Sequence, residues 1–291
     1  MARGFMWMTM VGGLLPACSG PTVAPEAKAP DTHAEKDANT DTPPVAPPSN
    51  AHILSAYHGL DRLPPRVLRI CPGPSVRKDG MPVTFSVRLD GDTLSPEDFS
   101  VETAAGETVT PTCATLLPAD EPLERRTVLL AGTFGTAEAP PRSVKVVGDL
   151  KATNGASIKG LRTTTITPLA AGPSLLLAER FSPTTPGLAG ECPPATQQVV
   201  QLTWQGGVTG PQGAELGEAQ RTSVTVTLED GSTVTPLALA DDDPDNVVHV
   251  CLDVATRAQS VSVSAGHFHD PGDDANPETR IEVISGVPSI R

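Results

Sequence analysis

Short runs in which apolar and polar residues alternate dominate the chain. Val83, Phe85 and Val87 share one face of an extended segment, as do Val224 and Val226 further along. Alternation with a period of two is typical of a strand that buries one face. Turn residues interrupt these runs about every ten residues, and helical periodicity is hard to find. The pattern therefore predicts an all-β fold of antiparallel sandwiches.

An internal repeat divides the strand-rich part of the chain. Phe99–Pro111 aligns with Val224–Pro236 at an offset of 125 residues, through the sequences GETVTP and GSTVTP. A second pair of matching strands starts at residues 127 and 247, and a third at residues 143 and 260. Three matched strands in the same order indicate a duplicated unit. The length suits two domains, and we predict one β-sandwich over residues 51–171 and another over residues 172–291.

The N-terminal residues predict export. Arg3 is followed by an apolar stretch from Gly4 to Leu15, and residues 1–17 together are typical of a secretion signal peptide. The ending LPAC resembles the lipobox of bacterial lipoproteins, which implies cleavage before Cys18 and a lipid on that cysteine. An ordinary secretory signal that is cut a few residues later is the alternative.

Residues 18–50 predict a disordered tether. From Ser19 to Asn50 the chain has seven prolines and no aromatic residue, a composition that cannot bury a core. No later apolar run is long enough to span a bilayer, so a membrane partner would be reached through the lipid. The formal net charge of −13 makes nucleic acid a poor partner. We expect a protein of the cell envelope that is anchored to a membrane, and the bacterial outer membrane is the first candidate. Its partner would be an unidentified surface ligand or protein.

Four cysteines follow Cys18. An even number in an exported chain predicts disulfide bonds, and the absence of a Cys-x-x-Cys pair argues against zinc and against a redox dithiol. One bond within each repeat would join Cys71 to Cys113 and Cys192 to Cys251. The alternation around Cys251 places its side chain away from the apolar face, where a loop would have to cover it.

The first repeat resembles the bacterial Ig-like modules of S-layer and other surface proteins. In those modules an apolar strand leads into an Asp-x-x-Thr-Leu-x-Pro turn and a Phe-x-Val strand, with an Asp and an Asn-Gly late in the domain. The corresponding residues are Asp90, Thr93, Leu94, Pro96, Phe99, Val101, Asp149, Asn154 and Gly155. The resemblance implies tandem Ig-like sandwiches that serve as spacers or adhesive stalks and carry no catalytic residues.

Two acidic loops distinguish the second repeat. Residues 241–246 (DDDPDN) precede one apolar strand, and residues 270–277 (DPGDDANP) follow the next. A hairpin closed at Ala255–Ala258 would bring both loops to one end of the sheet, and their oxygen-rich side chains suit calcium. We predict one or two structural Ca²⁺ ions, with the ligands Asp241, Asp243, Asp245, Asn246, Asp270, Asp273, Asp274 and Asn276. Ordinary solvated turns are the alternative.

Sequence motifs for catalysis are missing, because the chain has no GxSxG, no HExxH and no phosphate-binding glycine loop. In the expected hairpin, His249 does not converge with His267 and His269, which argues against a histidine metal site. The leading hypothesis is a calcium-stabilised surface protein that acts as a structural spacer or an adhesion or binding module. A hydrolase that uses aspartates of the second repeat and a calcium-dependent carbohydrate-binding module are the alternatives.

Overall fold

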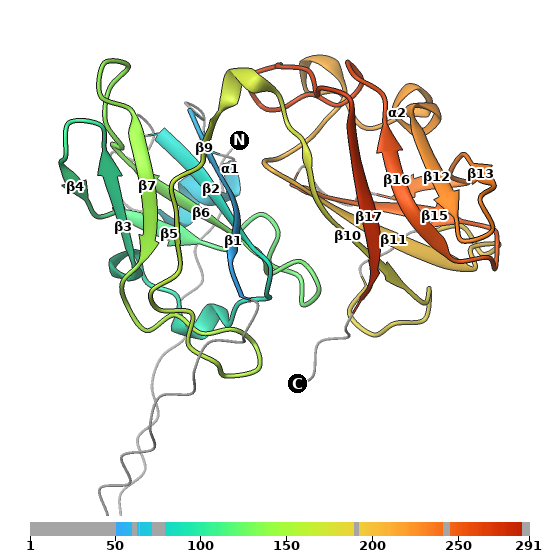
Figure 1. The fold of residues 1–291 in the computed structure, drawn as a ribbon, viewed down its shortest axis with the longest axis horizontal. Coiled ribbons are helices and arrows are strands. Elements are labelled where there is room, and N and C mark those ends of the chain that lie inside the picture. The colour runs from blue at the N-terminus through green and yellow to red at the C-terminus, as the bar shows by residue number, and fades with distance from the viewer. Residues whose placement is uncertain are drawn as a thin grey trace, which may run out of the picture. The chain divides into compact units, whose positions relative to one another are not determined.

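The computed structural model describes residues 51–59, 63, 65–71, 79–188, 192–240 and 245–286. The predicted signal peptide and tether, including Cys18, lie outside the described residues, as do the predicted ligands Asp241 and Asp243. The described residues all fall within one compact unit. They are rich in β-strands and contain only short helices, in agreement with the all-β prediction (Figure 1). Residues 51–171 are called the first half below, and residues 172–286 the second half.

Two sheets make up the described part of the first half, a five-stranded one in the order β5-β6-β2-β1-β9 and a four-stranded one in the order β4-β3-β7-β8. The strands are β1 (Ile53–His58), β2 (Asp79–Phe85), β3 (Phe99–Thr103), β4 (Thr108–Val109), β5 (Cys113–Thr115), β6 (Thr127–Gly132), β7 (Pro141–Val146), β8 (Arg162–Thr163) and β9 (Ile166–Pro168). Helix α1 (Pro65–Ile70) connects β1 to β2, and 3-10 turns cover Gly91–Thr93, Pro96–Asp98 and Leu169–Ala171.

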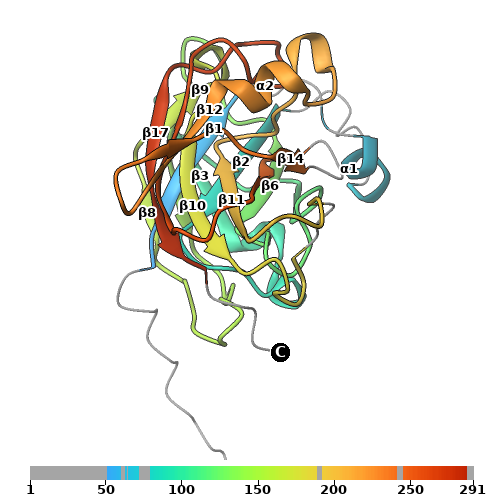
Figure 2. The same cartoon turned by 90° about the vertical axis from the view of Figure 1, so that its right-hand side faces the viewer.

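One eight-stranded sheet makes up the described part of the second half, in the order β13-β12-β16-β17-β10-β11-β15-β14. Its strands are β10 (Leu175–Phe181), β11 (Gln198–Trp204), β12 (Val224–Leu228), β13 (Thr233–Val234), β14 (Ala238–Ala240), β15 (Val247–Leu252), β16 (Ala258–Val263) and β17 (Thr279–Ser285). A 3-10 turn covers Pro211–Gly213, and helix α2 (Glu218–Ser223) leads directly into β12 (Figure 2).

The two halves pair their strands in the same way, as the internal repeat predicts. In the second half β17 joins two parts of the sheet, because it pairs antiparallel with β16 and parallel with β10. In the first half this role is divided, since β8 pairs antiparallel with β7 and β9 pairs parallel with β1. The remaining pairings match one for one, from β3-β4 with β12-β13 to β5-β6 with β14-β15. A break between β8 and β9 is thus the main difference between the halves.

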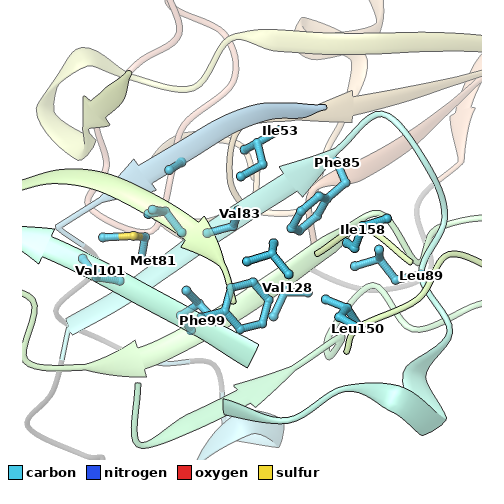
Figure 3. Close-up of a cluster of buried hydrophobic side chains, with 14 of the residues drawn as sticks. Ile53, Met81, Val83, Phe85, Leu89, Phe99, Val101, Val128, Leu150 and Ile158 are labelled. Carbon is cyan, nitrogen blue, oxygen red and sulfur yellow. The ribbon is translucent and has the colours of Figure 1, made fainter. Parts of the chain in front are cut away.

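Each half encloses its own apolar core. In the first half Val83 and Phe85 of one sheet lie in the same buried cluster as Phe99 and Val101 of the other (Figure 3). In the second half the sheet curls, so that strands from both of its ends, β15 and β12, contribute to one cluster around Trp204. The Trp204 ring stacks on Phe268 with 4.8 Å between ring centroids. Fully burying an aliphatic or aromatic side chain of this size contributes about 1.5–3 kcal/mol, which makes these clusters the main source of stability.

The hairpin expected between the strands at residues 247–252 and 258–263 is wrong. β15 pairs with β11 and β14, whereas β16 pairs with β12 and β17. Both strands still face the same core, through Val250 on β15 and Val261 on β16. The connection between them therefore crosses from one side of the core to the other. Alternation specifies which face of a strand is buried and leaves its partner undefined.

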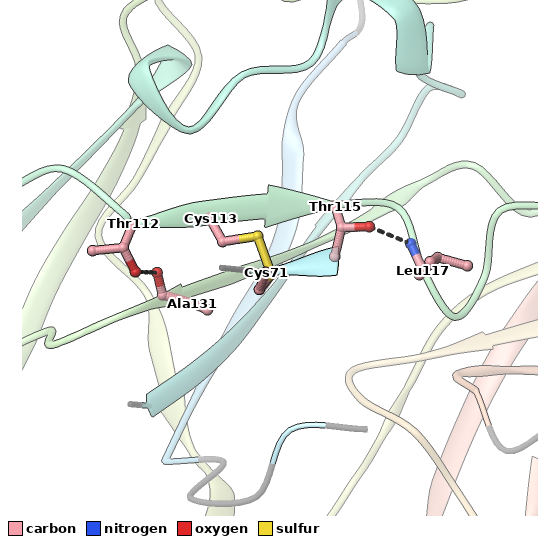
Figure 4. The surroundings of a disulfide bond; sticks show 6 residues. All are labelled: Cys71, Thr112, Cys113, Thr115, Leu117 and Ala131. Atoms are coloured by element: carbon pink, nitrogen blue, oxygen red, sulfur yellow. Dashed lines mark hydrogen bonds between the residues drawn. A yellow bond between two sulfur atoms is a disulfide. The ribbon is translucent and has the colours of Figure 1, made fainter. Parts of the chain in front are cut away.

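Disulfide bonds join Cys71 to Cys113 and Cys192 to Cys251, each within one half and each with 5.6 Å between Cα atoms. Cys251 points away from the apolar face of β15, and it is fully buried and bonded to Cys192. Figure 4 shows the other bond, in which Cys113 belongs to the edge strand β5. The hydroxyl of Thr112 donates to the carbonyl oxygen of Ala131, and the hydroxyl of Thr115 accepts from the backbone N–H of Leu117. Each bond ties the segment after the first strand of its half to the pair of strands at one end of the sheet, β5-β6 in the first half and β14-β15 in the second.

Candidate functional site

A buried ion cluster joins the two halves. The carboxylate of Glu179, on β10, accepts a hydrogen bond from Arg88 at 2.9 Å and two from Arg126 at 3.0 and 2.8 Å. The three side chains are between 3% and 7% exposed. Burial, and next the neighbouring Arg126, lower the pKa of Arg88 to about 10, which leaves this guanidinium charged at neutral pH. Bidentate contacts to a planar guanidinium define the relative orientation of the groups they join.

Further hydrogen bonds join the two halves. The Tyr57 hydroxyl, on β1, lies 2.8 Å from Oδ2 of Asp270 and 2.8 Å from the carbonyl oxygen of Leu169. The Asn246 amide donates to Oγ1 of Thr127 at 2.9 Å. Asp270 and Asn246 are both predicted calcium ligands, and here each holds the second half against the first. We call the set of contacts between the halves the junction.

Three carboxylates meet at the junction, from Glu121, Glu124 and Asp245. One ligand atom from each lies within 4.8 Å of the other two, Glu124 and Asp245 are buried, and Glu121 is half-buried. Glu121 and Glu124 belong to the loop before β6, and Asp245 belongs to the equivalent loop before β15. Ionised carboxylates at this separation repel each other by about 3.5 kcal/mol per pair at an effective dielectric constant of 20. We call these residues the carboxylate cluster.

Two polar side chains of the second half lie beside the loop that carries Glu121 and Glu124. Nε2 of His249 is 3.7 Å from Oε1 of Glu124, which makes an ion pair when the imidazole is protonated. Gln201, the cross-strand neighbour of His249, donates from Nε2 to the carbonyl oxygen of Leu123 at 3.4 Å. Among the described residues, neither Oε1 of Gln201 nor Oε2 of Glu121 has a hydrogen-bond partner, and both atoms are buried. The loop that carries two of the three carboxylates thus contacts a buried amide whose oxygen has no donor among the described residues.

A small apolar cavity adjoins the carboxylate cluster. It has a volume of about 50 Å³ and is lined by Leu116, Pro118, Leu129, Gly206, Asp245 and Pro271, among others. Pockets for small organic ligands usually measure about 300–1,000 Å³, so this space does not suit a sugar or a peptide side chain. A larger, more open hollow of about 280 Å³ is lined by residues of the first half, including Asp92, Asp120 and Arg125, and shares Leu116 and Leu117 with the smaller cavity.

The second acidic loop is folded around the side chain of Asp270. Its Oδ1 accepts hydrogen bonds from the backbone N–H groups of Gly272 at 2.8 Å and Asp274 at 3.0 Å. Burial raises the pKa of this carboxyl above its usual range, although the hydrogen bond from Tyr57 opposes the shift. Burial also raises the pKa of Tyr57, and its contact with Asp270 adds to the effect. Asp270 therefore serves as a structural acceptor for both its own loop and β1.

Two of the remaining predicted ligands of this loop, Asn276 and Asp273, also contact protein groups. Oδ1 of Asn276 accepts from the backbone N–H groups of His267 and Phe268 at 2.9 Å each, and its amide donates to two carbonyl oxygens. Asp273 has a backbone φ of 67° and lies 2.9 Å from Nδ1 of His269. The carboxylate of Asp245 lies close to those of Glu121 and Glu124. Calcium binding by the two acidic loops stays a prediction.

The sequence reasoning missed the contribution of the first half. Residues 116–125 (LLPADEPLER) precede β6 as residues 241–246 precede β15, and the equivalence was visible in the repeat. Treating the repeats as separate domains left no reason to combine their loops. The signal that could have found the site is the presence of acidic residues at equivalent positions of both repeats.

No helix among the described residues is long and apolar enough to cross a membrane. Comparison with models of known protein families gives no match, and comparison with curated proteins gives none either.

Proposed function

We propose that this chain is an exported, lipid-anchored protein of the bacterial cell envelope that acts as a spacer or adhesion module. In this proposal its two halves are Ig-like sandwiches, and the tether over residues 18–50 links them to a lipid on Cys18. The signal peptide and the LPAC ending support the anchor, and the matching strand pairings of the two halves support tandem sandwiches. The unidentified partner would be a ligand or protein at the cell surface.

The observation that carries the proposal is the buried ion cluster of Arg88, Arg126 and Glu179. A flexible link between domains normally leaves a small and polar interface, and the domains then move independently. Here charged groups of both halves are buried against each other, with Glu179 accepting three hydrogen bonds from the two arginines. Breaking such a contact costs several kcal/mol because it leaves a buried charge without its partner. Such a contact would keep the two sandwiches at one angle, as a spacer requires.

Calcium stabilisation is part of this proposal, and the carboxylate cluster supports it. The alternative functions receive less support from the described residues. Glycoside hydrolases place their two carboxyl groups about 5–9.5 Å apart beside a substrate cleft. The carboxylates here lie beside a cavity of about 50 Å³, which leaves no room for a sugar. A carbohydrate-binding surface would need exposed aromatic side chains, and aromatic residues make up 3% of this chain, several of them buried.

Cell fractionation tests the anchor. The full chain and its Cys18→Ser variant would be expressed in a bacterium that processes lipoproteins, with a reporter fused after Arg291. We expect the unsubstituted protein in the membrane fraction, because several acyl chains give stable attachment. We expect the variant, which carries no lipid, in the soluble exported fraction. Membrane attachment of the Cys18→Ser variant would contradict the lipid anchor.

Distance measurement tests the fixed angle between the sandwiches. Spin labels on Thr153→Cys and Ser232→Cys, in a Cys18→Ser background, occupy exposed positions of the first and second half. A narrow distance distribution is expected, and Glu179→Gln should broaden it. A broad distribution in the protein without Glu179→Gln would contradict a rigid spacer.

A further inference from the structure

We propose that Glu121, Glu124 and Asp245, together with the amide oxygen of Gln201, bind one calcium ion at the junction. The inference deepens the proposed function and rests on it for the exported, calcium-rich setting. Oxygens bound to one Ca²⁺ at about 2.3–2.6 Å can be no more than about 5.2 Å apart. The three carboxylates offer ligand atoms within 4.8 Å of one another, so a single ion can reach all of them.

The buried amide of Gln201 is a second, independent sign of a ligand. Gln201 is 1% exposed, and its Oε1 accepts no hydrogen bond from any described residue. Nε2 of the same amide donates to the carbonyl oxygen of Leu123, which also accepts from Nε of Arg88. Leu123 lies between Glu121 and Glu124 in the sequence, so the amide group packs against the loop that carries these carboxylates. A buried carbonyl oxygen without a donor loses its interaction with water and gains nothing in return. A bound cation would satisfy it.

The chemistry of the donors favours calcium over other divalent ions. All four proposed ligand atoms are oxygens, three of them from carboxylates, and calcium accepts six to eight oxygen ligands in irregular geometry. Magnesium requires a near-ideal octahedron with shorter bonds, and zinc prefers nitrogen and sulfur ligands in a tetrahedron. Water molecules from the adjoining cavity would complete the coordination of calcium.

The ion would connect the two halves. Glu121 and Glu124 come from the first half, and Gln201 and Asp245 come from the second. Calcium would therefore replace carboxylate repulsion across the junction with attraction to a shared cation. The ion cluster around Glu179 orients the halves. Calcium would add a second contact between them, whose occupancy depends on the calcium concentration around the protein.

Calorimetric titration and thermal unfolding test the site in the Cys18→Ser chain, first freed of metal with a chelator. We expect one calcium site per chain with a Kd on the order of 10⁻⁴ M, the range of extracellular modules. At 100 times Kd, calcium should raise Tm by roughly 5–10 °C for a protein of this size. Magnesium and zinc are titrated in parallel, and tighter binding of either one than of calcium would overturn the choice of ion.

Matched variants locate the ion. Glu121→Gln changes the most exposed of the three carboxylates and is the safest for folding, while Asp245→Asn tests the buried one. Each should weaken calcium binding at least tenfold. Asp149→Asn, at a side chain that is 91% exposed on the first half, should leave the affinity unchanged. If Asp245→Asn fails to fold, Glu121→Gln alone decides.

Three results would overturn the proposal: no heat of binding together with no change in Tm, unchanged affinity in Glu121→Gln, or loss of binding in Asp273→Asn with retention in Glu121→Gln. The last result would place the ion in the loop over residues 270–277. None of these results affects membrane attachment through Cys18 or the distance distribution without calcium, so failure of this site is distinguishable from failure of the proposed function.

Discussion

Arg126 and Glu179 form a two-point contact across the junction, from Nε to Oε2 at 3.0 Å and from Nη2 to Oε1 at 2.8 Å. Arg126 immediately precedes β6 of the first half, and Glu179 lies in the middle of β10 of the second. The pair, with Arg88, makes the outer face of β10 part of the protein interior. Four measurable consequences follow from this and from the other contacts described above.

Removing the charge of Glu179 should destabilise the whole described unit. Glu179→Gln leaves Arg88 and Arg126 buried without their counter-charge, and loss of one partner of a buried ion pair costs about 3–5 kcal/mol. Urea unfolding followed by Trp204 fluorescence measures the loss. Glu102→Gln, which breaks the exposed pairs with Arg142 and Arg162, is the control and should change stability little. Equal effects of the two substitutions would mean that the junction contributes no more than a surface ion pair.

The two halves should unfold together. Trp204 is buried in the core of the second half, and the other tryptophan of the chain lies in the predicted signal peptide, so fluorescence of the processed protein reports the second half. Far-UV circular dichroism reports both halves. We expect coincident transitions by the two probes, which is the test of a two-state process. A separate, earlier transition seen by circular dichroism alone would show that the halves are independent.

The stability of the protein should carry a pH dependence from Asp270. Because burial raises its folded pKa, folding favours the protonated carboxyl. This contribution is fully present below the unfolded pKa of about 3.9 and is lost as the pH rises through the folded pKa. Asp270→Asn imitates the protonated form and avoids the loss. Its free energy of unfolding, minus that of the unsubstituted protein, should therefore rise with pH across this window and level off above it.

Thermal or urea unfolding between about pH 3 and pH 7 checks the prediction for Asp270. Subtracting one free energy of unfolding from the other removes the contributions of titrating groups that the two proteins share. Asp274→Asn, at a neighbour whose charge contributes less to the shift, should show a smaller change. A difference that stays constant, or falls with rising pH, would contradict the assignment.

The first disulfide should tolerate a transfer of one cysteine to the neighbouring strand. Cys113 and Ala131 are direct partners in the β5-β6 pairing and both pack near Cys71. The double substitution Cys113→Ala with Ala131→Cys should therefore still form a bond to Cys71. Non-reducing peptide mapping checks it. Closing a loop of this size contributes about 4 kcal/mol by the chain-entropy estimate, so a free thiol at Cys71 would also appear as a large loss of stability.

The strands could be predicted from the sequence, but their partners could be predicted only in part. Alternation at Val248 and Val250 identified the core-facing side of β15 correctly. The same alternation is compatible with a hairpin and with a connection that crosses the core, because both bury the same face. The repeat was the better guide to topology, since strands at equivalent positions of duplicated units take equivalent partners.

The junction could not be predicted, because its residues look like solvent-facing positions of a strand. Glu179 and Gln201 are polar residues on the face away from the core, where water is the usual neighbour. Only the packing of one half against the other buries them, and contacts between distant segments leave no local pattern. Glu121 and Glu124 lie in a loop equivalent to the one that carries Asp245, but two separate domains would not bring these loops together.

The positions of the disulfides bear on the history of the chain. Cys113 stands on β5 opposite Ala131, whereas in the second half Ala238 stands on β14 opposite Cys251. A crosslink inherited unchanged from a common ancestor of the two halves would join equivalent residues in both. Here the paired positions are equivalent, but the cysteine lies on β5 in the first half and on β15, the equivalent of β6, in the second. If the two halves arose by duplication, at least one of these cysteines was gained or replaced afterwards, and the two covalent links at this position have separate origins.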